Sequence, residues 1–181
     1  MIEGSHPELV GPLRDGEIDL LVGALRPQMP DGIAQRPLFE DRPLIFARTG
    51  HPLAAMGGSF GPEDLLRYPW IVPAQGTPLR TQWGVMFEAA GVPAPRVAIE
   101  CGSALMVRQM LIDSDFLTLL STDQLAVEVA AGLLTAVGDA PGDISRTIGI
   151  TTREDWRPTA LQSRFVDMLR TSTQTAEYRK S

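Results

Sequence analysis

Two short stretches carry residue types that could bind a small anion. In PAQGTPLRTQ, residues 73–82, Thr77 is a common helix N-cap, and the proline after it suits the first helical position. The loop residues Gln75 and Gly76 precede it, and free backbone N–H groups at such a helix start attract a negative group. Arg80 could add a guanidinium fork for a carboxylate. An ordinary capped helix that binds nothing has the same features, so both interpretations stay open.

The stretch ECGSALMV, residues 100–107, repeats this arrangement. Gly102 would allow close approach of a ligand, and Ser103 takes the place of the cap. Both stretches follow predicted strands, and helix starts that follow adjacent parallel strands face one crevice, where open α/β sheets bind ligands. Together the two stretches favour a small-molecule cleft. Its polar wall and its arginine indicate an anionic or polyhydroxylated metabolite, with sugars, sugar acids and carboxylic acids all open.

Residues that could support catalysis or metal binding are scarce. Glu63 and Asp64 follow a proline, which is the composition of a helix's first turn, where acids favour the helix dipole. His6 and His51 both precede prolines and lack the E-x-x-H spacing of metal sites. Ser103 has no G-x-S-x-G surroundings, and no glycine-rich phosphate loop is found. We therefore expect no catalytic residue, no metal site and no cofactor.

The composition is that of a globular protein that does not itself bind nucleic acid. The 181 residues are 44% hydrophobic, enough for a substantial core, and the formal net charge is −6. Cys101 is the single cysteine, which excludes an internal disulfide and fits a reducing compartment. The sequence shows no basic-then-apolar leader and no apolar run near the roughly 20 residues that cross a bilayer. We therefore expect a cytoplasmic protein that does not enter a membrane.

Short strands and helices are expected to alternate along the chain, as in an α/β fold. A capping box of Ser5 and Glu8 predicts the first helix, and Gly16 supplies its left-handed end. The next apolar run suits a parallel strand covered on both faces, and Asp19 within it is expected to bind backbone N–H groups. The polar tail after Arg170 is expected to fray. Strands are predicted at 18–22, 33–39, 42–47, 70–72, 96–99, 116–120, 133–137 and 144–152, and further helices at 79–90, 104–112, 124–131 and from 158.

In this order and spacing, four stretches resemble the effector-binding domain of LysR-type transcriptional regulators. They are LRDGEIDLLVG (13–23), RPLIFARTGHPLA (42–54), DLLRYPWIV (64–72) and DFLTLLS (115–121). The resemblance covers nearly the whole chain and rests on the four stretches together, because each alone is common by chance. It implies a two-lobed α/β fold similar to type 2 periplasmic binding proteins, with mostly parallel sheets, flanking helices and two crossover strands.

The resemblance also implies how the chain is divided. Lobe I would comprise residues 1–50 together with a return strand and C-terminal helix at 141–181, and lobe II would comprise residues 51–140. The family's first strand and helix would come before Ile2, as would its winged helix-turn-helix. DNA binding would then belong to a segment outside this sequence. We expect a homo-oligomer, most simply a dimer.

Effector contacts in the family, made in a cleft between the lobes, come from positions that match five residues of this chain. Two are Thr77 and Ser103, and the others are Gly23, Ala24 and Ser121. The predicted ligand site therefore comprises Gly23, Ala24, Gln75, Gly76, Thr77, Arg80, Ser103 and Ser121. The alternative function is an enzyme or a transport-type solute-binding protein on the same scaffold, since a fold does not define a function.

Overall fold

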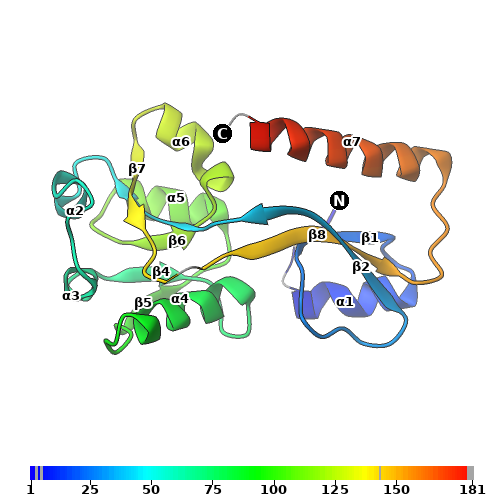
Figure 1. Cartoon of the computed structure of the whole chain (residues 1–181), viewed down its shortest axis with the longest axis horizontal. Coiled ribbons are helices and arrows are strands. Elements are labelled where there is room, and N and C mark those ends of the chain that lie inside the picture. Colours follow the sequence, from blue (N-terminus) through cyan, green and yellow to red (C-terminus); the bar gives the residue numbers. More distant parts are fainter. Residues whose placement is uncertain (3, 5, 143, 179–181) are drawn as a thin grey trace. The chain divides into compact units, whose positions relative to one another are not determined.

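The computed structural model describes residues 1–2, 4, 6–142 and 144–178, and the fold is α/β. The chain forms two compact units (Figure 1). Unit 1 comprises Met1–Asp41 and Arg146–Ser181, and unit 2 comprises Arg42–Ser145. The chain therefore passes from one unit to the other twice. The lobe boundaries expected at residues 50 and 140 both lie within unit 2, because the strands that flank them pair with each other there.

The described residues of unit 1 form a three-stranded antiparallel sheet and two helices. Its elements are α1 (His6–Asp15), β1 (Leu20–Ala24), β2 (Ile33–Asp41), β8 (Arg146–Arg153) and α7 (Ala160–Tyr178). Figure 1 shows β8 between β1 and β2, in agreement with the strand order β1-β8-β2. Helix α7 continues beyond Arg170 as far as Tyr178, and the fraying of this polar tail stays a prediction. Ser5, the predicted cap of α1, lies outside the described residues.

Strand β1 differs from its prediction in both pairing and burial. It pairs antiparallel with β8, with Leu20 opposite Thr152. Among the described residues it has no second partner strand, and Val22 is 49% exposed. The prediction of a parallel strand covered on both faces is therefore wrong. The run of apolar residues indicates burial in general, but the partner strand comes from a distant part of the chain that local pattern does not define.

The end of α1 is held by an arginine rather than by Asp19. Gly16 has φ 79°, the left-handed conformation predicted for it. Arg153 on β8 donates from Nη1 to the backbone oxygens of Leu13, at 2.7 Å, and Ile18, at 3.1 Å. Asp19 is exposed and accepts no hydrogen bond from the described residues, so its predicted backbone contacts are wrong.

Unit 2 combines parallel and antiparallel strands. Its elements are β3 (Leu44–Arg48), α2 (Pro52–Ala55), α3 (Pro62–Leu65), β4 (Trp70–Val72), α4 (Pro78–Ala89), β5 (Val97–Glu100), α5 (Ala104–Ile112), β6 (Thr118–Leu120), the 3-10 helix η1 (Thr122–Leu125), α6 (Ala126–Ala130) and β7 (Leu134–Asp139). β4 pairs in parallel with β5, and a parallel bridge from Trp70 to Leu117 joins β4 to the start of β6. β3 runs antiparallel to β6 and β7. Parallel pairing is thus confined to β4, β5 and β6 among the described strands, because β3 brings the chain into unit 2 and β7 leads it back.

An aromatic cluster fixes α4 against β4. Trp70 is fully buried, and its ring meets those of Trp83 and Phe87 edge-on, at centroid distances of 5.8 and 5.6 Å. Trp83 and Phe87 are 5.2 Å apart, one helical turn from each other. The indole N–H of Trp70 donates to the backbone oxygen of Leu65 at 3.1 Å, so its one polar atom is satisfied.

Within the described part of the chain, none of the helices has the length and apolar character of a membrane span.

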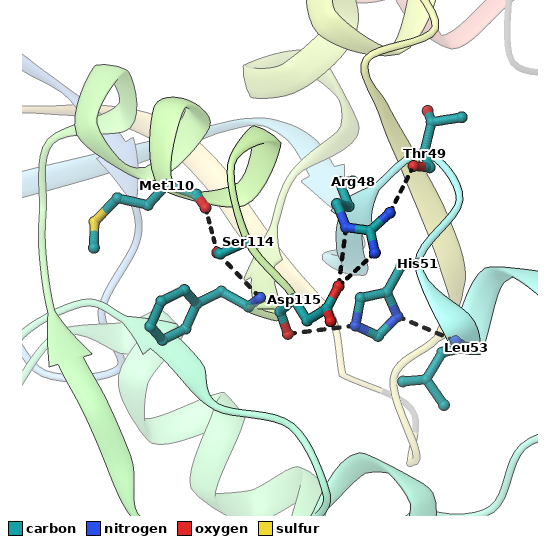
Figure 2. A network of polar contacts seen from close by, with 8 residues as sticks. Arg48, Thr49, His51, Leu53, Met110, Ser114 and Asp115 are labelled. Carbon is teal, nitrogen blue, oxygen red and sulfur yellow. Dashed lines mark hydrogen bonds and ion pairs between the residues drawn. The ribbon is translucent and has the colours of Figure 1, made fainter.

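A polar network around His51 joins α2 to the turn before β6 (Figure 2). His51 is buried, and its Nδ1 accepts the Leu53 N–H at 3.1 Å, which makes it the N-cap of α2. Nε2 therefore carries the proton, and it donates to the backbone oxygen of Asp115 at 3.3 Å. The Asp115 carboxylate also binds Arg48, at 2.7 Å from Nη2. Burial lowers the pKa of His51 from its ordinary 6.5, while its contact with Asp115 opposes this shift.

Candidate ligand-binding site

Three parallel strands of unit 2 lead to one edge of the sheet, and each is followed by a predicted site residue. Parallel strands share a direction, so the segments that leave β4, β5 and β6 leave from the same edge. The N-caps of the next three helices follow there: Thr77 before α4, Ser103 before α5 and Ser121 before η1. We call this region the carboxyl edge of unit 2. Six predicted residues belong to it: Gln75, Gly76, Thr77, Arg80, Ser103 and Ser121.

Thr77 forms the predicted cap of α4. Its Oγ1 accepts the Arg80 N–H at 3.4 Å and donates to the backbone oxygen of Ala74 at 2.8 Å. Gly76 has φ 80°, and this left-handed conformation lets the loop turn from Gln75 into the helix. Both loop residues are exposed. The cap is confirmed, whereas the contact of Thr77 with a ligand stays a prediction.

Ser103 and Ser121 differ in their exposure and in their hydrogen bonds. Ser103 is the N-cap residue of α5, as predicted, and is exposed, although its side chain makes no capping hydrogen bond. The Ser103 hydroxyl makes no other hydrogen bond with the described residues. Ser121 is buried, and its backbone N–H donates to Oε1 of Gln124 at 3.4 Å. Of the two serines, Ser103 is the more accessible to a ligand.

Arg80 is a mostly buried cation with few partners. Its side chain is 16% exposed, and Cζ lies 4.6 Å from the centroid of the Trp83 ring, in a cation–π contact. The nearest acid is Glu100, whose Oε1 lies 3.9 Å from Nη2, beyond hydrogen-bonding distance. Nη1 is buried and has no hydrogen-bond partner among the described residues. A desolvated guanidinium in this condition would be stabilised by an added acceptor.

The other two predicted residues lie in unit 1. Gly23 and Ala24 are in β1, opposite Gly149 and Ile148 of β8. Gly23 is exposed, and a Cβ atom at this position would have open space around it. The structure thus gathers six of the eight predicted residues at one edge of unit 2 and places these two on a strand of unit 1.

Two residues beside Arg80 were not among the predicted ligand contacts. Trp83 follows Arg80 by three positions on the same helix, a spacing that puts the two side chains on one face and could have indicated their contact. Glu100 gave no such signal, because it lies twenty positions from Arg80 in the sequence and only the fold brings the two side chains together. Arg80 therefore contacts one neighbour along its own helix and one that only the fold brings close to it.

Other parts of the described chain offer less to a ligand. The described residues include no group of three or more His, Cys, Asp and Glu side chains that could hold a metal ion. A pocket of about 320 Å³ in unit 2 contains none of the predicted site residues. It is lined by Arg42, Pro43, Asp139, Ala140, Gly142 and Ile144. The candidate site is therefore defined by strand ends and helix starts, not by this pocket.

Comparison with known proteins agrees with the fold. A profile of the family described as LysR substrate binding domain matches residues 1–174. The HTH-type transcriptional regulator GalR of Pseudomonas putida is 33% identical over 142 residues, which are 78% of this chain and 35% of that protein. The HTH-type transcriptional regulator PcaQ of Agrobacterium fabrum is 31% identical over 171 residues, which are 94% of this chain and 55% of that protein. The chain thus spans about half or less of the length of these relatives.

Two solved structures with bound ligands have the same fold. The CcmR regulatory domain of Synechocystis PCC6803 in complex with 2-PG is similar at TM-score 0.77 and 23% identity, over 93% of this chain and 80% of that one. The effector binding domain of QuiR in complex with shikimate is similar at TM-score 0.76 and 14% identity, over 95% and 79%. The chain belongs to the LysR substrate-binding domain family and has its type 2 periplasmic-binding-protein-like fold. This confirms the resemblance seen in the sequence.

Proposed function

We propose that this chain is the effector-sensing domain of a LysR-type transcriptional regulator and binds a small polar or anionic metabolite at the carboxyl edge of unit 2. One observation carries the proposal: three parallel strands lead into three N-caps at one edge, beside a mostly buried arginine whose Nη1 has no acceptor among the described residues. Ligands of open α/β sheets bind at such edges. Gly23 and Ala24 remain further predicted contacts.

The proposed ligand is a sugar, a sugar acid or a carboxylic acid. The hydroxyl of Ser103 and the exposed backbone at Gly76 suit polar groups, and Arg80 suits an anion. The complexes of CcmR with 2-PG and of QuiR with shikimate support a small effector by analogy. No reaction is proposed, because the six predicted residues at the carboxyl edge include no histidine and no acid that could act as a general base.

The effector would act by differential binding. A ligand that binds one conformation more tightly than another shifts the population towards it, and no covalent step is needed. In the whole protein, a segment outside this sequence would bind DNA, and the protein would work in the cytoplasm as a homo-oligomer. The names of the curated relatives, HTH-type transcriptional regulators, support the DNA-binding part of this proposal.

A thermal-shift screen tests the site. The chain is screened against sugars, sugar acids, aromatic acids and amino acids, since ligand at about 100 times Kd should add about 2.7 kcal/mol of stability. We expect the shift produced by a hit to be lost in Ser103→Ala, which removes no capping bond and should leave the free protein's stability unchanged. Thr77→Ala should also lose the shift, although the free protein would lose about 1 kcal/mol with its cap.

Thr49→Ala is the matched control. Thr49 follows β3 beside Arg48, at the opposite edge of the sheet, where the turn before β6 lies (Figure 2). The hit should keep its full shift in this variant. A hit that survives both Ser103→Ala and Thr77→Ala would show that the ligand binds elsewhere.

A further inference from the structure

We infer that Glu100 holds the place of a ligand carboxylate beside Arg80, so that the carboxyl edge selects effectors with a carboxylate over neutral sugars. The inference rests on the proposed function and narrows its ligand class. It starts from an asymmetric pair: Arg80 is 16% exposed, whereas Glu100 is 44% exposed. The cation is fixed and desolvated, while its acid is not.

Arg80 is oriented before any ligand arrives. Its guanidinium lies over Trp83, which is buried and meets Trp70 and Phe87 edge-on. At its backbone, the Arg80 N–H is bound by the hydroxyl of Thr77. Both ends of the residue are therefore held by α4 and its core. When a ligand binds this guanidinium, the arginine side chain would therefore lose little conformational entropy.

Glu100 satisfies Arg80 only weakly. At 3.9 Å, Oε1 and Nη2 attract each other but form no hydrogen bond, and a pair with one exposed partner is largely screened by water. Glu100 can turn into solvent at small cost, because nearly half of its side chain is already there. Arg80 cannot do so, because Nη1 is buried without an acceptor. A ligand carboxylate can therefore replace the Glu100 carboxylate beside the Arg80 guanidinium.

A carboxylate fits this position better than a sugar hydroxyl does. Two carboxylate oxygens can take two parallel N–H groups of a guanidinium at about 2.8 Å and neutralise its charge. A hydroxyl offers an uncharged oxygen, and it gains nothing from displacing Glu100. Glu100 itself shows that a carboxylate can be placed beside the guanidinium. The charge of Glu100 should therefore compete with an acidic ligand and barely affect a neutral one.

Acetate and acetamide test this directly, since they have the same shape and differ in charge. Binding to the whole chain is followed by the Arg80 Nε–Hε signal in ¹H–¹⁵N NMR and by thermal shift. We expect acetate to move the Arg80 signal, and Glu100→Gln to tighten acetate binding roughly three- to tenfold, because one nearby negative charge is removed. The thermal shift produced by acetate should vanish in Arg80→Gln. Acetamide should move neither readout in any variant.

Glu88→Gln is the control, because it makes the same charge change at an exposed position near the far end of α4. It should leave acetate binding unchanged. An Arg80 signal that responds equally to acetamide, or acetate affinity that Glu100→Gln does not raise, would overturn the inference. A hit from the metabolite screen that Ser103→Ala abolishes but Arg80→Gln leaves intact would overturn it too, while leaving the proposed function standing.

Discussion

Replacing His51 should destabilise unit 2 far more than its place in an H-P-L turn suggests. The imidazole caps α2 through the Leu53 N–H, contacts the Asp115 backbone and packs 4.4 Å from the Tyr68 ring. A cap contributes about 1 kcal/mol, and an aromatic contact contributes about 1 kcal/mol more. Truncating a fully buried ring adds a cavity cost. We therefore expect His51→Ala to lower the free energy of unfolding by about 3 kcal/mol.

Urea unfolding monitored by tryptophan fluorescence measures this change. Two tryptophans, Trp70 and Trp83, lie in unit 2, and Trp156 lies in unit 1. A Trp156→Phe background therefore makes the fluorescence report on unit 2. His51→Asn is the matched variant, because asparagine is a good N-cap and should recover about 1 kcal/mol relative to His51→Ala. Equal losses in the two variants would refute the capping role.

The same histidine predicts how the stability of unit 2 depends on pH. Burial lowers the pKa of His51 in the folded state below its ordinary 6.5. At pH values between the folded-state pKa and 6.5, the unfolded chain therefore binds more protons than the folded one. Stability should be fully present above about pH 6.5 and fall as the pH drops towards the folded pKa. The protonated ring can no longer accept the Leu53 N–H. His51→Asn should flatten this part of the profile, and an unchanged slope in that variant would exclude His51 as its cause.

Two further substitutions test unit 1. Gly149→Ala should lower the free energy of unfolding of unit 1 by about 2–4 kcal/mol, because the added Cβ would lie 2.4 Å from the backbone oxygen of Arg36. Gly23 lies opposite Gly149 in β1, and a Cβ there would meet open space. Gly23→Ala should therefore change the free energy of unfolding by less than about 1 kcal/mol. Comparable denaturation midpoints for the two variants would contradict this account. Arg153→Gln should lower the free energy of unfolding by about 1–3 kcal/mol and speed amide hydrogen exchange at the end of α1, because it removes the charged donor to Leu13 and Ile18. Arg157→Gln, at an exposed position, is the control and should change neither quantity. Unchanged exchange in Arg153→Gln would show that the arginine does not hold this end.

Features that depend on neighbouring residues could be predicted from the amino-acid sequence. β4 and α5 have their predicted bounds, residues 70–72 and 104–112. Gly16 takes its predicted left-handed conformation, and Thr77 caps α4. Capping, turns and hydrophobic periodicity act within a few positions of the chain, so local patterns can show them. The order of these elements, with the four quoted stretches, was enough to indicate the family.

Contacts between residues far apart in the chain became visible in the folded structure alone. β1 lies antiparallel to β8, and Arg153 binds the backbone of Leu13 across 140 positions of the chain. Arg48 binds Asp115 across 67 positions. The predicted site shows the same division: the sequence identified Arg80, but only the fold brought Glu100 beside it. Such pairs depend on how strands are ordered and helices are packed, which no local pattern specifies.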